Sequence, residues 1–194
     1  MLVTLRSYIR RSCFLTRTTQ SFAHKDDILA NFIAAAKRNN EMECEAILES
    51  LHVDDVDVIN GTDSFGNSPL MLCSQRNWYE SCQRLIDLHC EVNHQNVFGS
   101  SALMCGASHG YAETLHTLLE CDRVDINLLS RYGQTALMKA VQAGKLNTFQ
   151  ILVQAGADVS VRNKQGKSAY DIAMERNHQH IIEEFRRIGY EDRK

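Results

Sequence analysis

The sequence of 194 residues has little proline, few aromatic residues and no long apolar run. It contains one proline, Pro69, and one tryptophan, and aromatic residues make up 7% of the chain. So little proline argues against a β fold built from many loops and against a proline-rich linker. No run of about 18 apolar residues is present, so we expect no membrane insertion.

Motifs that carry catalytic or cofactor chemistry are also missing. No phosphate loop of the GxxxxGK[ST] type and no C-x-x-C pair occurs. The seven cysteines are odd in number and match no disulfide framework, so we interpret them as reduced thiols. Cys105 shares a segment with His109 and His116, but no glycine elbow or oxyanion motif accompanies them. We therefore expect no enzyme and no cofactor.

A zinc site is the main alternative for the cysteines and the eight histidines. Such a site needs three or four donors that converge from close range. The nearest histidine pair is His178 and His180, and on a helix this spacing points the two rings apart. We therefore expect buried thiols and surface histidines, and no metal.

Charge is distributed unevenly along the chain. Residues 1–25 contain five bases and no acid, which leaves 16 Lys and Arg against 24 Asp and Glu, a net charge of -8, for the rest. Such an acidic body repels phosphate backbones, so nucleic acid is not an expected partner.

The basic segment at residues 1–24 contains arginine, serine and threonine and no acid, a composition that resembles a mitochondrial transit peptide. Arg17 precedes the Thr18–Thr19 bond by a spacing similar to many matrix-processing sites. The alternative is a disordered basic tail on a cytosolic or nuclear protein. We predict a mitochondrial location and leave this segment out of the fold.

Most of the remaining chain is self-similar. Four strings align: FGNSPLMLC from Phe65, FGSSALMCG from Phe98, YGQTALMKA from Tyr132 and QGKSAYDIA from Gln165. Their glycines are spaced by 33, 34 and 33 residues. The same steps recur in two further sets of positions, 85, 118, 152 and 185, and 60, 93, 127 and 160. Three sets in one register indicate a repeated supersecondary unit.

Each unit has the signals of two short helices. The glycine suits a turn that needs positive φ, and the following Ser68, Ser101, Thr135 or Ser168 suits an N-cap. The proline falls at the first helical position, and Asn77, Gly110, Gly144 and Asn177 suit a left-handed helix end. Neither helix could bury its apolar face alone, whereas stacked copies can. The methionines Met71, Met104 and Met138 either pack between repeats or line an adaptable groove.

The motif GQTALMKAVQAG at 133–144, followed by ILVQAGADVS at 151–160, resembles the ankyrin repeat. The resemblance is strong from about residue 61 onward. A degenerate copy of the repeat precedes that region, at 28–60. It is five residues longer than the later repeats, and the stretch 53–57 fits these extra residues. It implies an all-α solenoid of helix-turn-helix units joined by β-hairpin-like loops. The expected division is a transit peptide or basic tail at 1–24, a degenerate capping repeat at 25–60, repeats at 61–94, 95–127 and 128–160, and a C-terminal capping repeat at 161–194.

The resemblance also implies a concave face, made of loop tips and first-helix ends, that binds a protein partner. The candidate residues are Phe65, Asn67, Arg76, Phe98, His109, Arg131, Tyr132, Gln142, Lys164 and Arg176. The aromatic residues either engage an extended segment or helix, or only brace the loops. The expected function is a non-enzymatic adaptor, assembly or regulatory factor in mitochondria, monomeric on its own. The alternatives are a cytosolic or nuclear adaptor and a fixed subunit of a larger complex.

Overall fold

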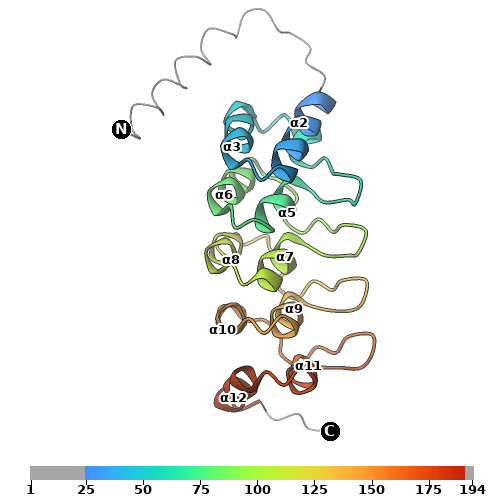
Figure 1. The fold of residues 1–194 in the computed structure, drawn as a ribbon, viewed down its shortest axis with the longest axis vertical. Helices are drawn as coiled ribbons and strands as arrows, with labels where there is room; N and C mark the ends of the chain where they lie inside the picture. Colours follow the sequence, from blue (N-terminus) through green and yellow to red (C-terminus); the bar gives the residue numbers. More distant parts are fainter. Residues whose placement is uncertain (1–24, 191–194) are drawn as a thin grey trace, which may run out of the picture.

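The computed structural model describes residues 25–190, which form two parallel rows of stacked helices (Figure 1). The inner row, beside the long loops, contains α2 (Lys25–Lys37), α5 (Pro69–Ser74), α7 (Ala102–His109), α9 (Ala136–Gln142) and α11 (Ala169–Glu175). The outer row contains α3 (Glu41–Ser50), α6 (Tyr79–Asp87), α8 (Ala112–Leu119), α10 (Leu146–Gln154) and α12 (Gln179–Arg187). The predicted all-α repeat solenoid is confirmed, and residues 25–190 contain no β-strand.

The segment between the first helix pair and the first long loop contains a short helix, α4 (Val56–Ile59), that the sequence analysis did not predict. Its residues Val58 and Ile59 are buried, which is why this stretch folds back onto the core. No helix in the described part of the chain is long and apolar enough to span a bilayer. The predicted transit peptide, residues 1–24, lies outside the described residues.

The inner helices α5, α7, α9 and α11 begin where the hydroxyl residues predicted them to begin. Each hydroxyl oxygen accepts a hydrogen bond from the backbone N–H three residues later, at 3.4 Å for Ser68, 3.4 Å for Ser101, 3.2 Å for Thr135 and 3.1 Å for Ser168. Pro69 occupies the first turn of α5, where its missing N–H leaves no bond unmade. Each such cap contributes about 1 kcal/mol of stability.

The turn between the two helices of a pair uses a left-handed residue each time. The φ angles are 61° at Asn77, 88° at Gly110, 69° at Gly144 and 56° at Asn177, as the sequence predicted. Asn39 has a φ of 57° at the corresponding place between α2 and α3. The first helix pair, whose sequence has diverged most, therefore keeps the same turn.

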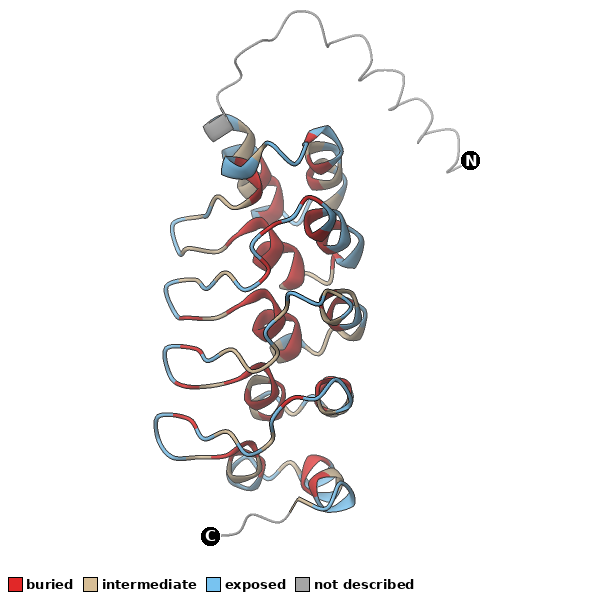
Figure 2. Cartoon of the chain, turned by 180° about the vertical axis from the view of Figure 1, so that it is seen from behind, coloured by how far each residue is buried: buried red, intermediate tan, exposed pale blue. Residues whose placement is uncertain are grey.

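The core runs along the whole stack, between and within the helix pairs (Figure 2). The apolar set at positions 85, 118, 152 and 185 is fully buried. The three methionines are buried as well, so they pack between repeats and do not line a groove. Phe149 and Phe185 lie 4.8 Å apart between ring centroids, which joins α10 to α12.

The third repeated set joins neighbouring repeats through side-chain amides. The Oδ1 atoms of Asn60, Asn93 and Asn127 accept hydrogen bonds from backbone N–H groups at 2.8, 2.8 and 2.9 Å, and the donors are Glu91, Asp125 and Asp158. Asn93 also donates from Nδ2 to the carbonyl oxygen of Arg123, at 2.7 Å. Each asparagine thus fixes the loop base of the repeat that follows it.

Candidate partner-binding face

The four long loops are each held by one short polar side chain. The side-chain oxygens of Asp63, Asn96, Ser130 and Asn163 accept hydrogen bonds from the backbone N–H groups two and four residues later, over distances of 2.9 to 3.3 Å. This turn type satisfies loop N–H groups that would otherwise have no partner. The sequence analysis missed it, although these four positions repeat with the same steps as the glycines.

The charge of Asp63 is stabilised by its place in this turn. Partial burial raises the pKa of the Asp63 carboxyl, but hydrogen bonds from the backbone and side chain of Asn67 and from the Phe65 N–H hold the pKa below its usual value. The asparagines at 96 and 163 use the same Oδ1 geometry without a charge. The loop therefore needs an oxygen acceptor here and does not need an ion.

Backbone hydrogen bonds join each loop to the next. Val97 donates to the carbonyl oxygen of Phe65 at 3.0 Å, Arg131 to that of Phe98 at 3.2 Å, and Lys164 to that of Tyr132 at 3.1 Å. The aromatic residues thus lie at equivalent places in adjacent loops, and we call Phe65, Phe98 and Tyr132 the tip row. These residues are 55%, 51% and 62% exposed, so none of them belongs to the core.

The loops and the inner helices line one continuous face, which we call the tip-and-helix face (Figure 1). Three contacts join loop side chains to inner-helix side chains. Gln134 donates to Gln142 at 3.1 Å, Lys167 pairs with Glu175 at 2.6 Å, and Arg162 pairs with Asp171 at 3.1 Å. A partner that reaches the loop tips can therefore also reach the helix ends.

The ten predicted site residues differ in how far they are exposed on this face. The exposed ones are Phe65, Phe98, His109, Arg131, Tyr132, Lys164 and Arg176, and the half-buried ones are Asn67, Arg76 and Gln142. Gln142 lies against the loop, and Asn67 accepts a hydrogen bond from the Asn96 side chain at 2.9 Å. Five of the six loop positions are therefore exposed, compared with two of the four helix-end positions.

Two helix-end residues are engaged within their own repeats. Arg76 donates to the Leu72 carbonyl oxygen at 2.8 Å, and its guanidinium lies 5.6 Å from the Trp78 ring centroid. His109 stacks on Tyr111 with 5.4 Å between ring centroids. These contacts hold the Arg76 and His109 side chains against their own helix ends.

Two further residues on this face were missed by the sequence analysis. Leu129 is exposed directly before the turn residue Ser130, and Gln95 donates to its carbonyl oxygen at 2.8 Å. Lys139 lies on α9 at the position that Cys105 has on α7. The sequence contained a signal for both residues, because each differs in type from the equivalent residue one repeat earlier. Leu129 is apolar where Gln95 is polar, and Lys139 is basic where Cys105 is apolar.

Burial raises the pKa of three buried thiols, which disfavours their thiolate form. Burial raises the pKa of Cys44 to about 11 and that of Cys90 to about 12. Burial also raises the pKa of Cys105, although the hydrogen bond from Gln75 and the charge of Lys139 oppose it. Within residues 25–190, no three His, Cys, Asp or Glu side chains are grouped so that they could hold a metal ion.

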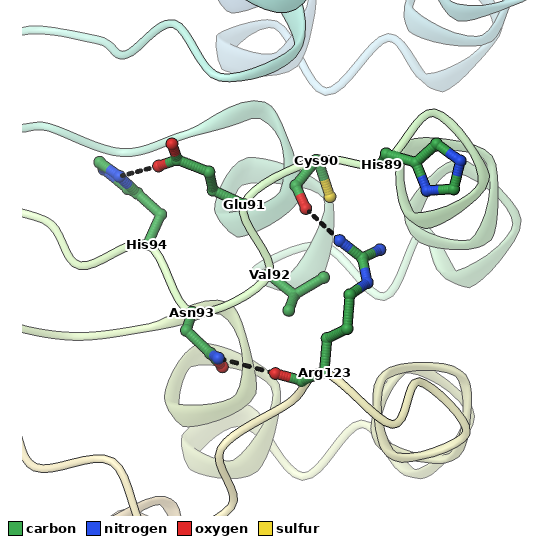
Figure 3. A pocket seen from close by; sticks show the side chains of 7 residues that line it. All are labelled: His89, Cys90, Glu91, Val92, Asn93, His94 and Arg123. Carbon is green, nitrogen blue, oxygen red and sulfur yellow. Dashed lines mark hydrogen bonds and ion pairs between the residues drawn. The ribbon is translucent and has the colours of Figure 1, made fainter. Parts of the chain in front are cut away.

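A hollow of about 460 Å³ lies between the loop bases of two repeats (Figure 3). It is lined by His89, Cys90, Glu91, Val92, Asn93, His94 and Arg123. The Arg123 guanidinium donates to the carbonyl oxygens of Cys90 and Ile86 at 3.0 and 3.2 Å, which caps the end of α6. Asn93 and Arg123 in this hollow thus join one repeat to the next.

Comparisons with known proteins agree with this architecture. A family model described as ankyrin repeats in three copies matches residues 32–129, and one described as ankyrin repeats in many copies matches residues 118–173. The Notch-regulated ankyrin repeat-containing protein of Xenopus laevis is 35% identical over 98 residues, which cover 48% of this chain and 81% of that protein.

Two other relatives are much longer than the region they share with this chain. The human transient receptor potential cation channel subfamily A member 1 is 28% identical over 142 residues, 73% of this chain and 12% of the channel. Ankyrin repeat protein OPG189 of vaccinia virus (strain Copenhagen) is 27% identical over 174 residues, which cover 75% of this chain and 30% of the viral protein. The chain thus corresponds to a small part of each of these two proteins.

Proposed function

Because the chain belongs to the ankyrin-repeat family, we propose that it is a non-enzymatic interaction module that binds a protein partner on the tip-and-helix face. The relatives include a cation channel and a viral repeat protein, so the repeats are what they share with this chain. Ankyrin folds serve many unrelated roles, so the function of this chain depends on the surface that its repeats present.

The observation that carries this proposal is the tip row. Large apolar side chains at the ends of loops contribute nothing to the core, yet three occur at equivalent places in successive loops. Aromatic side chains carry much of the binding energy in protein interfaces. No ring of the tip row contacts another aromatic ring in the described part of the chain, and the loop-to-loop bonds use backbone atoms. These facts favour an interface over a brace.

The test is the double substitution Phe98→Ala with Tyr132→Ala, used in quantitative affinity capture from cells. We expect the captured partner to fall at least about tenfold, because two interface aromatics each contribute more than about 1 kcal/mol. The melting temperature should stay nearly unchanged, because both side chains are exposed. The matched control is Met42→Ala with Tyr79→Ala, which removes exposed apolar side chains from the outer helices α3 and α6.

Two outcomes would contradict the proposal. Equal loss of partner and of thermal stability in the tip-row variant would mean that the rings pack within the protein. Full retention of the partner in that variant, with loss in the outer-helix control, would place the interface on the outer helices.

We further propose that the module acts in mitochondria, as an adaptor, assembly or regulatory factor. The support is the composition of residues 1–24, with arginines, hydroxyl residues and no acid. A fluorescent reporter fused to residues 1–26 should enter mitochondria, and the same fusion with Arg6, Arg10 and Arg11 changed to Gln should not. A reporter that stays diffuse with the natural segment would place the module in the cytosol or nucleus.

A further inference from the structure

The C-terminal part of the tip-and-helix face is basic, although the body of the protein is acidic. In the loops and inner helices at 128–142 and 161–176, six bases stand against two acids, an excess of four positive charges. The bases are Arg131, Lys139, Arg162, Lys164, Lys167 and Arg176, and the acids are Asp171 and Glu175. The chain after residue 25 carries 16 Lys and Arg against 24 Asp and Glu, so this excess runs against the overall charge.

The two acids of this region are already paired. Arg162 holds Asp171 at 3.1 Å, and Lys167 holds Glu175 at 2.6 Å. Arg131, Lys139, Lys164 and Arg176 form no ion pair with another residue of the described range. Arg131 and Lys164 are also exposed, at the tips of adjacent loops. Positive charge at the tips is therefore left uncompensated inside the protein.

Aromatic and basic residues alternate in a definite order along the loops. The loop-to-loop bonds place Phe65 beside Val97, Phe98 beside Arg131, and Tyr132 beside Lys164. Val97 is exposed like the tip row, so the first junction is apolar and the next two each combine an aromatic ring with a base. The face therefore has a direction, apolar toward the N-terminal repeats and basic toward the C-terminal repeats.

Resting on the proposed function, we propose that the partner presents an acidic polypeptide segment with apolar side chains at one end and carboxylates at the other. The apolar end lies over Phe65, Val97 and Phe98, and the carboxylates pair with Arg131 and Lys164. Arginine recognises carboxylates in a bidentate geometry, which adds direction to the charge attraction. Stacked helices lie 8–10 Å apart, so three steps cover about 30 Å, which about nine extended residues span.

The experiment is a display selection of random dodecapeptides on the full chain, followed by affinity measurements on the selected peptides. We expect sequences with a net negative charge whose acids cluster at one end and whose apolar residues cluster at the other. The charge-reversed variant Arg131→Glu with Lys164→Glu should bind them at least about tenfold more weakly, and raising the salt concentration should weaken binding to the natural protein because exposed charges are screened. The control Arg186→Glu with Arg187→Glu reverses two exposed charges on α12 and should bind like the natural protein.

The outcomes separate this inference from the proposed function. Selected peptides that are neutral or basic, and that lose affinity only for the tip-row variant Phe98→Ala with Tyr132→Ala, would overturn the acidic partner and leave the interaction module standing. The acidic partner would also be overturned if no selected peptide depended on Arg131 and Lys164 for binding. Peptides that bind all variants alike would overturn it too, and would in addition count against the tip-and-helix face as the binding site. Tighter binding of a single-stranded oligonucleotide than of the selected peptides, lost on charge reversal, would assign the face to nucleic acid instead.

Discussion

Gly99 and Gly166 have the same backbone conformation in different surroundings, so they provide a matched test of the loop-to-loop contact. Their φ angles are 70° and 74°, which non-glycine residues rarely adopt. A Cβ atom at Gly99 would lie 2.4 Å from the backbone nitrogen of Arg131, whereas a Cβ atom at Gly166 would meet nothing within 4 Å. Alanine at either place is strained, but only alanine at 99 collides with the next loop.

The expected magnitudes follow from these two terms. The left-handed conformation costs an alanine about 1–2 kcal/mol, and the lower entropy of the unfolded chain offsets roughly half of that. Gly166→Ala should therefore lower the free energy of unfolding by about 1 kcal/mol. Gly99→Ala must also move the following loop, which breaks the hydrogen bond from Arg131 to the Phe98 carbonyl and leaves both groups poorly satisfied, at a further cost of about 1–3 kcal/mol. We expect a total of about 3 kcal/mol.

Equilibrium unfolding in urea, followed by far-ultraviolet circular dichroism and by tryptophan fluorescence, measures both values. The two probes should report one transition with an unchanged dependence on urea, since neither substitution alters the exposed area of the unfolded chain. Equal destabilisation by the two alanines would refute the reasoning, because it would mean that the loops do not depend on one another for their position.

Two further predictions concern the core and the loop turn. Leu137→Ala removes a fully buried side chain from α9 and should lower the free energy of unfolding by about 2–5 kcal/mol in the same urea titration. The control Leu129→Ala changes an exposed position and should alter the free energy of unfolding by less than about 0.5 kcal/mol. Asp63→Asn keeps the Oδ1 acceptor, as Asn96 does in the next loop, so the turn should form at pH 7. Because the pKa of Asp63 is lowered in the folded state, its charge stabilises the natural protein above the unfolded-state pKa, and this contribution is lost as the pH falls through the folded-state pKa. Unfolding free energies measured from pH 7 to pH 3 should therefore fall more steeply for the natural protein than for Asp63→Asn, and parallel profiles would contradict this account.

The helix boundaries could be predicted because the residues that set them act within a few positions of themselves. Ser68 caps the helix that follows it directly, and Asn77 turns the chain between two adjacent helices. Such interactions depend on local backbone geometry, which a sequence pattern describes well. The same holds for the apolar positions, because a period of 33 or 34 residues identifies equivalent faces without identifying what they contact.

The contacts between repeats could not be predicted in this way. Asn93 was recognised as a repeated position, but its partners, Asp125 and Arg123, lie 32 and 30 residues away. Whether such groups meet depends on the distance and rotation between stacked units, which a period does not contain. Arg76 illustrates a second limit. Its position in the repeat suggests the binding face, but its guanidinium donates to the Leu72 carbonyl oxygen of the preceding helix, α5.

The loops separate the atoms that hold the fold from the atoms that remain available for a partner. Backbone atoms and one short acceptor, such as Asn96, fix each loop, while the side chain two residues later takes no part in that bonding. Positions 65, 98, 132 and 165 accordingly hold Phe, Phe, Tyr and Gln in the same turn. Removing an acceptor leaves loop N–H groups without a partner, at about 1–3 kcal/mol, whereas changing an exposed tip side chain costs less than about 0.5 kcal/mol. Stability therefore constrains the acceptor positions and leaves the tip positions open, and we propose that the aromatic and basic side chains at the tips serve a partner.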